Sequence, residues 1–471
     1  MSEPSASWLS ALKVYGDRRT IVILGLGFAS GLPNLLIFDT LSAWLRESGL
    51  SLEVIGFFSL ATLAYSFKFV WAPLVDRTRI PGLQAWLGHR RSWMLASQGA
   101  IIVGLWLIAG SDPVGNLGLV ALFALLTGFS SATQDIVIDA WRIEAAEETQ
   151  QGAMAAAYQW GYRLAVVVAG AAPLLLAETY GWSLSYTVMA SLMGIGVLAV
   201  FAAPREAVQV IVPRGRARLG SFLYGLFAEP LADFWNRFGR AALLILALIC
   251  LYRVSDFVLN IMNPFYLDLG FTKTEIAEVR KVFGVVMSML GVFLGGWAIA
   301  RYGLMRPLLV GALAGPLSNL VYVWLAAQGP DLTALFVAIG TDNIASGFSG
   351  TCLIAYMSSL TAAGFTATQY ALFSSLYSLP GKLIASQSGR IVEGAAHSAN
   401  AGGWFAPLTG LFAGGTSDSL NAAAAQIAVS GAALGAGYVT FFVYSFAIGL
   451  VAVVITVLVA RQRSQNPPEP H

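Results

Sequence analysis

Long apolar runs alternate with short charged or glycine-containing stretches along almost the whole chain. A helix crosses the roughly 30 Å hydrocarbon core of a bilayer in about 20 residues, at about 1.5 Å of rise per residue. Each run is long enough for this. The pattern predicts twelve membrane-spanning helices, whose boundaries it defines to within several residues. They are expected at 20–47, 52–76, 91–110, 115–142, 151–177, 183–203, 241–268, 274–300, 305–327, 333–360, 367–393 and 434–460.

Two longer segments interrupt this pattern. Residues 204–240 separate six runs from six, and their second half groups apolar side chains against polar ones, which predicts an amphipathic helix on the membrane surface. Its apolar residues are Phe222, Leu226, Leu231, Phe234, Trp235 and Phe238. Residues 395–433 are rich in Gly, Ala and Ser, and we expect the longest loop of the opposite face there. The predicted domains are an N-terminal six-helix bundle at 1–203, a linker at 204–240 and a C-terminal six-helix bundle at 241–471.

Composition supports an all-α membrane protein. Hydrophobic residues make up 57% of the chain, charged residues 11%, and the mean hydropathy is +0.70, whereas a soluble domain is about a quarter charged. The net charge of +2 does not indicate a nucleic-acid partner. The two cysteines and three histidines form no local metal-ligand motif, and we expect no cofactor.

The basic residues are distributed unevenly between the two sides of the predicted spans. If the N-terminus is cytoplasmic, eighteen Lys and Arg residues fall on that side and five on the other. Cytoplasmic loops carry the excess of basic residues in membrane proteins. The sequence therefore predicts that both termini and the 204–240 linker face the cytoplasm.

The two halves have a turn of small residues followed by a charged cluster in corresponding loops, as transporters built from repeats do. The loop after the second span reads APLVDRTRIPGLQAWLGHRR, and the loop after the eighth reads GGWAIARYGLMRP. The first resembles the Gly-x-x-x-Asp-Arg-x-Gly-Arg-Arg loop of the major facilitator superfamily, with an insertion. We predict a gate between helices at this level, formed by Asp76, Arg77, Arg90, Arg91, Arg142 and Arg301, with Asp139 close to it.

Several ionisable residues fall inside the predicted spans, where an unpaired charge costs on the order of 3 kcal/mol or more. Arg163 and Lys382 lie midway along the fifth and eleventh spans, which hold equivalent places in the two halves. These two cations need anions, which an anionic substrate would supply. The other charges inside the spans are Lys68, Asp39, Asp135, Asp139, Arg253 and Asp256.

These charges allow structural as well as functional interpretations. Arg253 and Asp256 are one turn apart and could form only an internal ion pair. Asp135 and Asp139 share one face of the fourth span. Since Asp135 has no cation beside it in the sequence, it is the favoured proton-coupling residue, with Asp256 and Asp139 as further candidates.

Aromatic side chains accompany the two central cations. Rings with polar tips suit sugars, although they also serve for ordinary packing. Together these observations predict a substrate-binding set of Arg163, Lys382, Lys68, Asp39, Tyr158, Trp160, Tyr377 and Arg253.

Five segments resemble one transporter family. LGFASGLPNLLIFDTLSAWL, SFKFVWAPLVDR, SSATQDIVIDAWR, GYRLAV and FTATQYALFSSL are similar to the AmpG-type muropeptide permeases, a branch of the major facilitator superfamily in the inner membrane of Gram-negative bacteria. The resemblance covers nearly all of residues 20–394. It implies import of anhydro-muropeptides by the proton motive force, for peptidoglycan recycling and with a link to β-lactamase induction. Its implied partners are an anionic sugar-peptide, protons and the lipid bilayer, and we expect a monomer.

Other functions remain open at this point. A related proton-coupled sugar, peptide or acyl-CoA carrier has the same pattern of spans. A membrane assembly factor on the same fold would need no cavity facing its buried cations. We find no H-E-x-x-H, no paired Cys and His residues and no serine elbow in a loop, so an enzyme is not expected.

Overall fold

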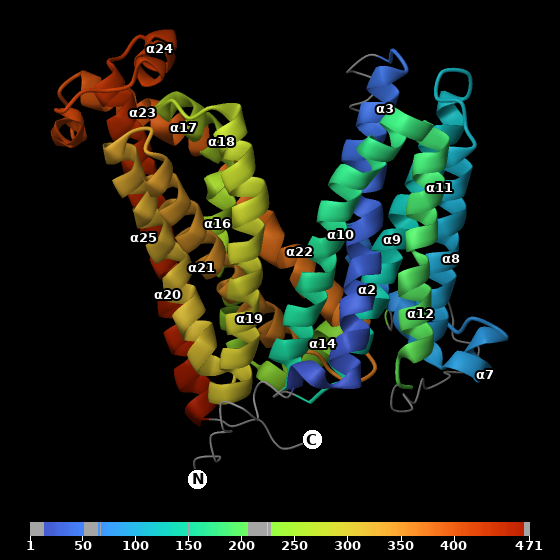
Figure 1. The fold of residues 1–471 in the computed structure, drawn as a ribbon. Coiled ribbons are helices and arrows are strands. Elements are labelled where there is room, and N and C mark those ends of the chain that lie inside the picture. Colours follow the sequence, from blue (N-terminus) through green and yellow to red (C-terminus); the bar gives the residue numbers. More distant parts are fainter. Residues whose placement is uncertain are drawn as a thin grey trace. The chain divides into compact units, whose positions relative to one another are not determined.

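The computed structural model describes residues 14–50, 65, 67–147, 150–205, 224 and 228–465 of the chain, and these contain helices but no strand (Figure 1). The helices before residue 240 are η1 (Val14–Gly16), α2 (Arg18–Leu35), η2 (Leu36–Thr40), α3 (Leu41–Glu47), η4 (Lys68–Val70), α6 (Ala72–Arg77), α7 (Leu83–Leu87), α8 (His89–Ala109), α9 (Leu117–Glu144), α10 (Gln151–Tyr180), α11 (Trp182–Leu192), α12 (Gly194–Ala202) and α14 (Glu229–Phe238). The later helices are α15 (Ala241–Leu251), α16 (Val254–Phe257), η7 (Val258–Ile261), α17 (Met262–Leu269), α18 (Lys273–Glu278), η8 (Val279–Phe283), α19 (Gly284–Tyr302), α20 (Met305–Gln328), α21 (Leu332–Ser359), α22 (Thr366–Ala385), α23 (Ser388–Asn400), η9 (Ala406–Phe412), α24 (Asp418–Gln426) and α25 (Gly431–Gln465).

The predicted all-helical membrane fold is confirmed. Within the described residues, nine helical segments are long and apolar enough to cross a membrane, and each overlaps a predicted span. The second predicted span, 52–76, lies mostly outside the described residues. The helices α21 and α22 coincide with the tenth and eleventh predicted spans but carry more Ser, Thr and Asn, and they are not among the nine. The full count of twelve therefore stays a prediction.

The contacts divide the chain into two compact units. Unit 1 comprises Met1–Phe238 and Met357–Ser375, and unit 2 comprises Gly239–Tyr356 and Leu376–His471. The first half of α22 thus packs with the N-terminal helices, whereas the sequence assigned it to the C-terminal bundle. The predicted domain boundaries themselves stay a prediction. Each unit is described separately below.

Glycines let α2 and α10 run side by side at backbone contact in unit 1 (Figure 1). A Cβ on Gly161 would lie 1.9 Å from the carbonyl oxygen of Leu24, and a Cβ on Gly27 would lie 2.2 Å from that of Tyr158. Small residues permit such close approach between helices within membranes. The contact brings Tyr158 of α10 next to Ser30 of α2, where a polar cluster forms.

The prediction of a long loop at 395–433 is wrong. This segment contains the end of α23, then η9 and α24, before α25 begins at Gly431. Phe412 of η9 is buried, and its ring lies where a Cβ on Gly435 of α25 would be. The predicted eleventh span also ends early, because α22 stops at Ala385 and α23 begins at Ser388. Hydropathy missed these helices because they bury short side chains such as Ala399, which packs with Ala433 and Ala436 of α25, without forming a long apolar run.

The described part of the linker forms α14, which packs against protein on one face. Phe234 is buried, and its ring centroid lies 5.3 Å from that of Phe373 on α22. Leu231 and Trp235 are exposed. Phe238 is partly buried, with its ring centroid 4.9 Å from that of Phe234, and the two remaining predicted anchors, Phe222 and Leu226, lie outside the described residues. Contact of the exposed face with a membrane surface stays a prediction.

Candidate functional site: buried charges in two helical units

A buried polar cluster joins α2, α9 and α10 in unit 1. Ser30 donates a hydrogen bond to the carboxylate of Asp135, and its hydroxyl lies 2.7 Å from that of Tyr158. Both Ser30 and Asp135 are buried. Among the described residues no cation lies within ion-pair distance of Asp135, and Lys68 acts on it only from further away. Because the neutral hydroxyl of Ser30 holds this carboxylate, Asp135 can gain or lose a proton without breaking an ion pair.

A second charged group lies one turn further along α9. The carboxylate of Asp139 is 3.8 Å from Nζ of Lys68 and 3.6 Å from Nη2 of Arg142. Arg142 is fully buried, and its guanidinium lies 5.3 Å from the ring centroid of Tyr370 on α22. Its three nitrogens have no hydrogen-bond partner within the described residues. Asp139 and Arg142 therefore form a group of their own, separate from the network around Asp76.

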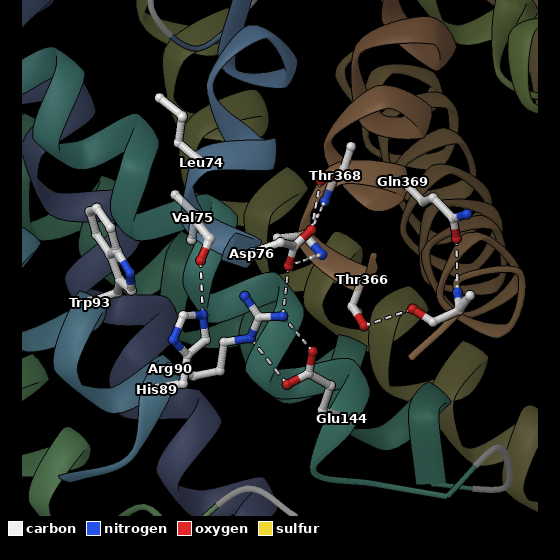
Figure 2. A network of polar contacts seen from close by, with 12 residues as sticks. Leu74, Val75, Asp76, His89, Arg90, Trp93, Glu144, Thr366, Thr368 and Gln369 are labelled. Carbon is white, nitrogen blue, oxygen red and sulfur yellow. Dashed lines mark hydrogen bonds and ion pairs between the residues drawn. The ribbon is translucent and has the colours of Figure 1, made fainter. Parts of the chain in front are cut away.

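Asp76 is the centre of a buried network that connects α6, α8, α9 and α22 of unit 1 (Figure 2). Its Oδ1 accepts a hydrogen bond of 2.8 Å from Nη2 of Arg90, and Arg90 also donates to both carboxylate oxygens of Glu144 at 2.7 and 3.1 Å. Its Oδ2 accepts from the backbone N–H and the hydroxyl of Thr368, at 2.8 and 2.6 Å. The backbone N–H of Ala367 donates to Oδ1 at 3.3 Å.

The geometry explains why a carboxylate is needed at Asp76. The helix α22 begins at Thr366, so the N–H groups of its first turn have no acceptor within the helix. A carboxylate satisfies them and also interacts favourably with the positive end of the helix dipole. The side chains of Asp76 and Arg90 are 1% and 0% exposed, so each charge depends on the other for compensation. Asp76 thus ties the end of α6 to a segment 292 residues later in the chain.

The other predicted gating residues have different partners. Nη2 of Arg77 forms an ion pair of 2.7 Å with Glu229 at the start of α14. Arg91 donates to two backbone oxygens, at 2.7 and 2.8 Å, and so braces α8 within unit 1. In unit 2, the guanidinium of Arg301 lies 5.3 Å from the ring centroid of Tyr302. The structure brings none of these three into the Asp76 network, and their gating roles stay predictions.

Sequence reasoning missed Glu144 and Gln369. The amide nitrogen of Gln369 donates to the carbonyl oxygen of Pro230 at 2.9 Å and to Asp233 at 3.0 Å, and its oxygen accepts from Arg237 at 3.1 Å. These contacts attach α14 to the start of α22. The FTATQ segment contains Gln369, but nothing in its local pattern indicates a partner in the linker.

Replacing Asp76 with Asn is expected to slow transport on the order of tenfold while leaving substrate affinity within a few-fold. The asparagine would keep one acceptor oxygen, and its NH₂ group would face the N–H groups of α22, so the attachment of α22 is weakened by about 1.5–3 kcal/mol. Initial uptake rates and equilibrium binding measure the two effects. The control is Asp112→Asn, an exposed carboxylate that also accepts from a backbone N–H. A collapse of binding in Asp76→Asn alone would refute a gating role.

Unit 2 contains a partly open cavity of ≈ 430 Å³. Arg253 lines it and donates to Asp256 through Nε and Nη2 at 2.9 and 2.8 Å, and to the hydroxyl of Ser346 at 2.7 Å. The ion pair considered from the sequence is therefore present. Asp342 of α21, which the sequence analysis did not select, accepts a hydrogen bond of 3.3 Å from Ser318. The full lining is Arg253, Asp256, Phe257, Leu259, Met262, Tyr266, Arg280, Tyr322, Ile339, Asp342, Asn343, Ser346 and Tyr377.

The remaining predicted residues are distributed over both units. Arg163 and Trp160 are partly buried on α10 of unit 1. Asp39 is exposed on the π-helical turn η2, between α2 and α3. The backbone at Lys382 belongs to α22 in unit 2, and its side chain lies outside the described residues. The proposed pairing of Arg163 with Lys382 stays a prediction.

Long apolar helices that pack around buried charged groups and a polar cavity are typical of a multi-pass membrane carrier. The sequence profile of the Major Facilitator Superfamily matches residues 23–385. The putative transporter AmpG 4 of Rickettsia felis is 33% identical over 386 residues, which cover 81% of this chain and 92% of that protein. The anhydromuropeptide permease of Escherichia coli K12 is 34% identical over 385 residues, covering 81% and 76%. The chain therefore belongs to the AmpG branch of the Major Facilitator Superfamily, and it is a transporter rather than an enzyme.

Solved structures support the same fold. The transporter FucP in its outward conformation has a TM-score of 0.60 at 13% identity, covering 92% of this chain and 98% of that chain. The proton:xylose symporter XylE has a TM-score of 0.59 at 12% identity, covering 99% and 97%. The human organic anion transporter MFSD10 has a TM-score of 0.57 at 16% identity, covering 96% and 100%. At such identities the likeness concerns the fold alone.

Proposed function

We propose that this protein imports anhydro-muropeptides, GlcNAc-1,6-anhydro-MurNAc peptides, from the periplasm to the cytoplasm for peptidoglycan recycling. The observation that carries the proposal is the 34% identity to the anhydromuropeptide permease of E. coli over 81% of this chain. The proton gradient supplies the energy, and the recycled products feed the signal that induces β-lactamase. The buried, protonatable side chain of Asp135 supports proton coupling.

The proposed location is the bacterial inner membrane, with the protein acting as a monomer and both termini in the cytoplasm. The eighteen-to-five distribution of basic residues supports this orientation. Reporter fusions to the 204–240 linker test it, and a periplasmic linker would exclude it.

Uptake of labelled disaccharide-peptide into inverted and right-side-out vesicles, with and without a proton gradient, tests the function. We expect accumulation into right-side-out vesicles only when the gradient is present. Accumulation of a different sugar, a peptide or an acyl-CoA instead would identify a related carrier. Absence of transport for every such compound would favour an assembly factor.

Arg163→Gln and Lys382→Gln are each expected to weaken binding of a peptide-bearing muropeptide on the order of tenfold. Both cations lie within predicted spans, where a substrate carboxylate would form charge-assisted hydrogen bonds with them. Binding of the disaccharide without its peptide is expected to change much less. Isothermal titration with the two ligands measures the difference.

The opposing interpretation is that each cation only braces its own unit. In that case both ligands would lose affinity equally, and thermal unfolding of the empty protein would shift to lower temperature. The substrate-binding interpretation requires an unchanged unfolding temperature. The matched control is Arg46→Gln, since Arg46 is an exposed arginine at the end of α3.

A further inference from the structure

Two polar contacts between α2 and α10 lie beside Asp135 in unit 1. In the first, the hydroxyl of Ser30 donates to the carboxylate of Asp135 and lies 2.7 Å from the hydroxyl of Tyr158. Because Ser30 has a single hydroxyl hydrogen and gives it to Asp135, it accepts the hydrogen of Tyr158. In the second, Nδ2 of Asn34 donates to the hydroxyl of Tyr162 at 3.0 Å. The hydroxyls of Tyr158 and Ser30 therefore form a continuous hydrogen-bonded path to the carboxylate.

The two contacts are one helical turn apart on both helices, since residues four apart in sequence lie on one face of a helix. Glycines fix this register. A Cβ on Gly27 would lie 2.2 Å from the carbonyl oxygen of Tyr158, and a Cβ on Gly31 would lie 2.5 Å from that of Tyr162. The helices α2 and α10 therefore run in the same direction, and the second contact lies one turn beyond the first along both of them.

The charged group at Asp139 lies on the opposite side of Asp135 from the two tyrosines. The helices α9 and α10 both span the membrane by length and composition and are joined by a short segment, so they run in opposite directions. Asp139, which lies 3.8 Å from Lys68, follows Asp135 by one turn along α9. In the predicted orientation α2 begins at the cytoplasmic side. The tyrosines then lie toward the periplasm, and Asp139 lies toward the cytoplasm.

Burial increases along the path from the tyrosines to the carboxylate. Tyr158 and Tyr162 are partly exposed, whereas Ser30 is fully buried and Asp135 is 8% exposed. A residue that couples transport to a proton gradient takes a proton from one face and releases it to the other, so it needs a route to each. Proton transfer requires groups within hydrogen-bond reach of one another, a condition that Tyr158 and Ser30 meet. The other ionisable groups that act electrostatically around Asp135 are Lys68, Asp139 and Tyr65.

We propose that the hydroxyls of Tyr158 and Ser30 relay protons between the periplasmic side of unit 1 and the carboxylate of Asp135. The relay rests on the proposed proton coupling and deepens it by adding a route to the coupling residue. In each transfer Tyr158 takes up a proton and gives its own to Ser30, and Ser30 gives its own to Asp135. One proton is then bound at the carboxylate, and both hydroxyls are restored. Tyr158 thus acts on the proton, whereas the sequence predicted that it contacts substrate.

Time-resolved infrared spectroscopy of the substrate-free protein tests the relay. The full chain is placed in liposomes with either its periplasmic or its cytoplasmic face outward, and the outer solution is acidified rapidly. The infrared band of protonated Asp135, assigned with Asp135→Asn, is then followed in time. We expect Tyr158→Phe to slow protonation from the periplasmic face about tenfold and to leave the rate from the cytoplasmic face within about twofold. Ser30→Ala interrupts the same path, should have the same effect, and replaces Tyr158→Phe if that variant does not fold.

The matched control is Tyr186→Phe. The hydroxyl of Tyr186 also belongs to a buried tyrosine that bonds to α2, but it donates to the backbone oxygen of Leu36 at 2.8 Å. This variant should protonate Asp135 at the wild-type rate from both faces. Equal slowing from both faces in Tyr158→Phe would overturn the relay, because a purely structural effect does not depend on the side. An unchanged rate from the periplasmic face, or a wild type in which Asp135 is never protonated, would overturn it as well.

Failure of the relay and failure of the proposed function are distinguishable, since the infrared measurement needs no substrate. A wild type that takes up no muropeptide, while Tyr158→Phe shows the side-dependent slowing, contradicts only the proposed substrate. A wild type that accumulates muropeptide with the gradient, while Tyr158→Phe is protonated at the wild-type rate from both faces, contradicts only the relay.

Discussion

Replacing Asp135 with Asn is expected to abolish accumulation against a gradient, so that substrate inside and outside vesicles equilibrates. Exchange of labelled for unlabelled substrate should continue within a few-fold of the wild-type rate. The reason is that Asn cannot bind and release a proton, while its oxygen still accepts the hydrogen bond from Ser30. An ionised carboxylate inside a membrane costs on the order of 3 kcal/mol. Because of this cost, we expect the buried Asp135 to bind and release a proton during the transport cycle.

Two further variants sharpen this prediction. Asp256→Asn, in unit 2, tests the alternative coupling residue under the same conditions. Asp112→Asn, at an exposed turn, is the control for loss of one negative charge. Full accumulation by the Asp135 and Asp256 variants, measured separately, would place the proton site elsewhere in the chain.

Replacing Arg90 with Gln is expected to lower the free energy of unfolding by about 3–5 kcal/mol, the usual cost of removing one partner of a buried ion pair. The substitution leaves Asp76 and Glu144 without their shared cation, and Arg90 is fully buried. Arg90→Lys should have a smaller effect, because a lysine keeps the charge but cannot form the fork of hydrogen bonds to two carboxylates. Denaturant or thermal unfolding of the purified protein measures the loss.

Glu144→Gln in the Arg90→Gln background provides an internal check. The double variant should recover part of the lost stability, since one uncompensated carboxylate is removed. Strictly additive losses, or an Arg90→Gln variant as stable as the wild type, would contradict the network in Figure 2. Arg46→Gln, at an exposed position, should unfold as the wild type does.

The helix α9 connects the two groups that these predictions address. It carries Asp135 in the polar cluster, Asp139 and Arg142 one and two turns later, and Glu144 at its end. Arg142 lies against Tyr370 of α22, the helix whose first turn Asp76 holds. A change of charge at Asp135 or Asp139 is therefore within about three turns of one helix of the contacts that retain α22. On the proposed roles of Asp135 in proton coupling and of Asp76 in gating, α9 would be the helix that connects the two.

The sequence by itself determined the class of the protein and the placement of most helices. A bilayer imposes a length and a polarity on each span, so one-dimensional hydropathy was enough to locate the nine helical segments of the described residues that are long and apolar enough to cross a membrane. The pairing of Arg253 with Asp256 was also accessible, because the two residues are three apart in the chain, although Arg253 is the N-cap residue of α16 and not part of one continuous helix. Hydropathy failed where helices are rich in alanine and polar residues, as in α23 and α24.

The partners of the buried charges were decided only by the tertiary structure. Asp76 meets Thr368 across 292 positions, and Arg90 meets Glu144 across 54. The sequence indicates that a charge within a span needs compensation, since burial makes an unpaired charge costly, but it does not say which of several opposite charges provides it. That choice depends on how the helices pack. In unit 1 the packing rests partly on the backbone contact of Gly161 with α2, which no periodicity in the chain reveals.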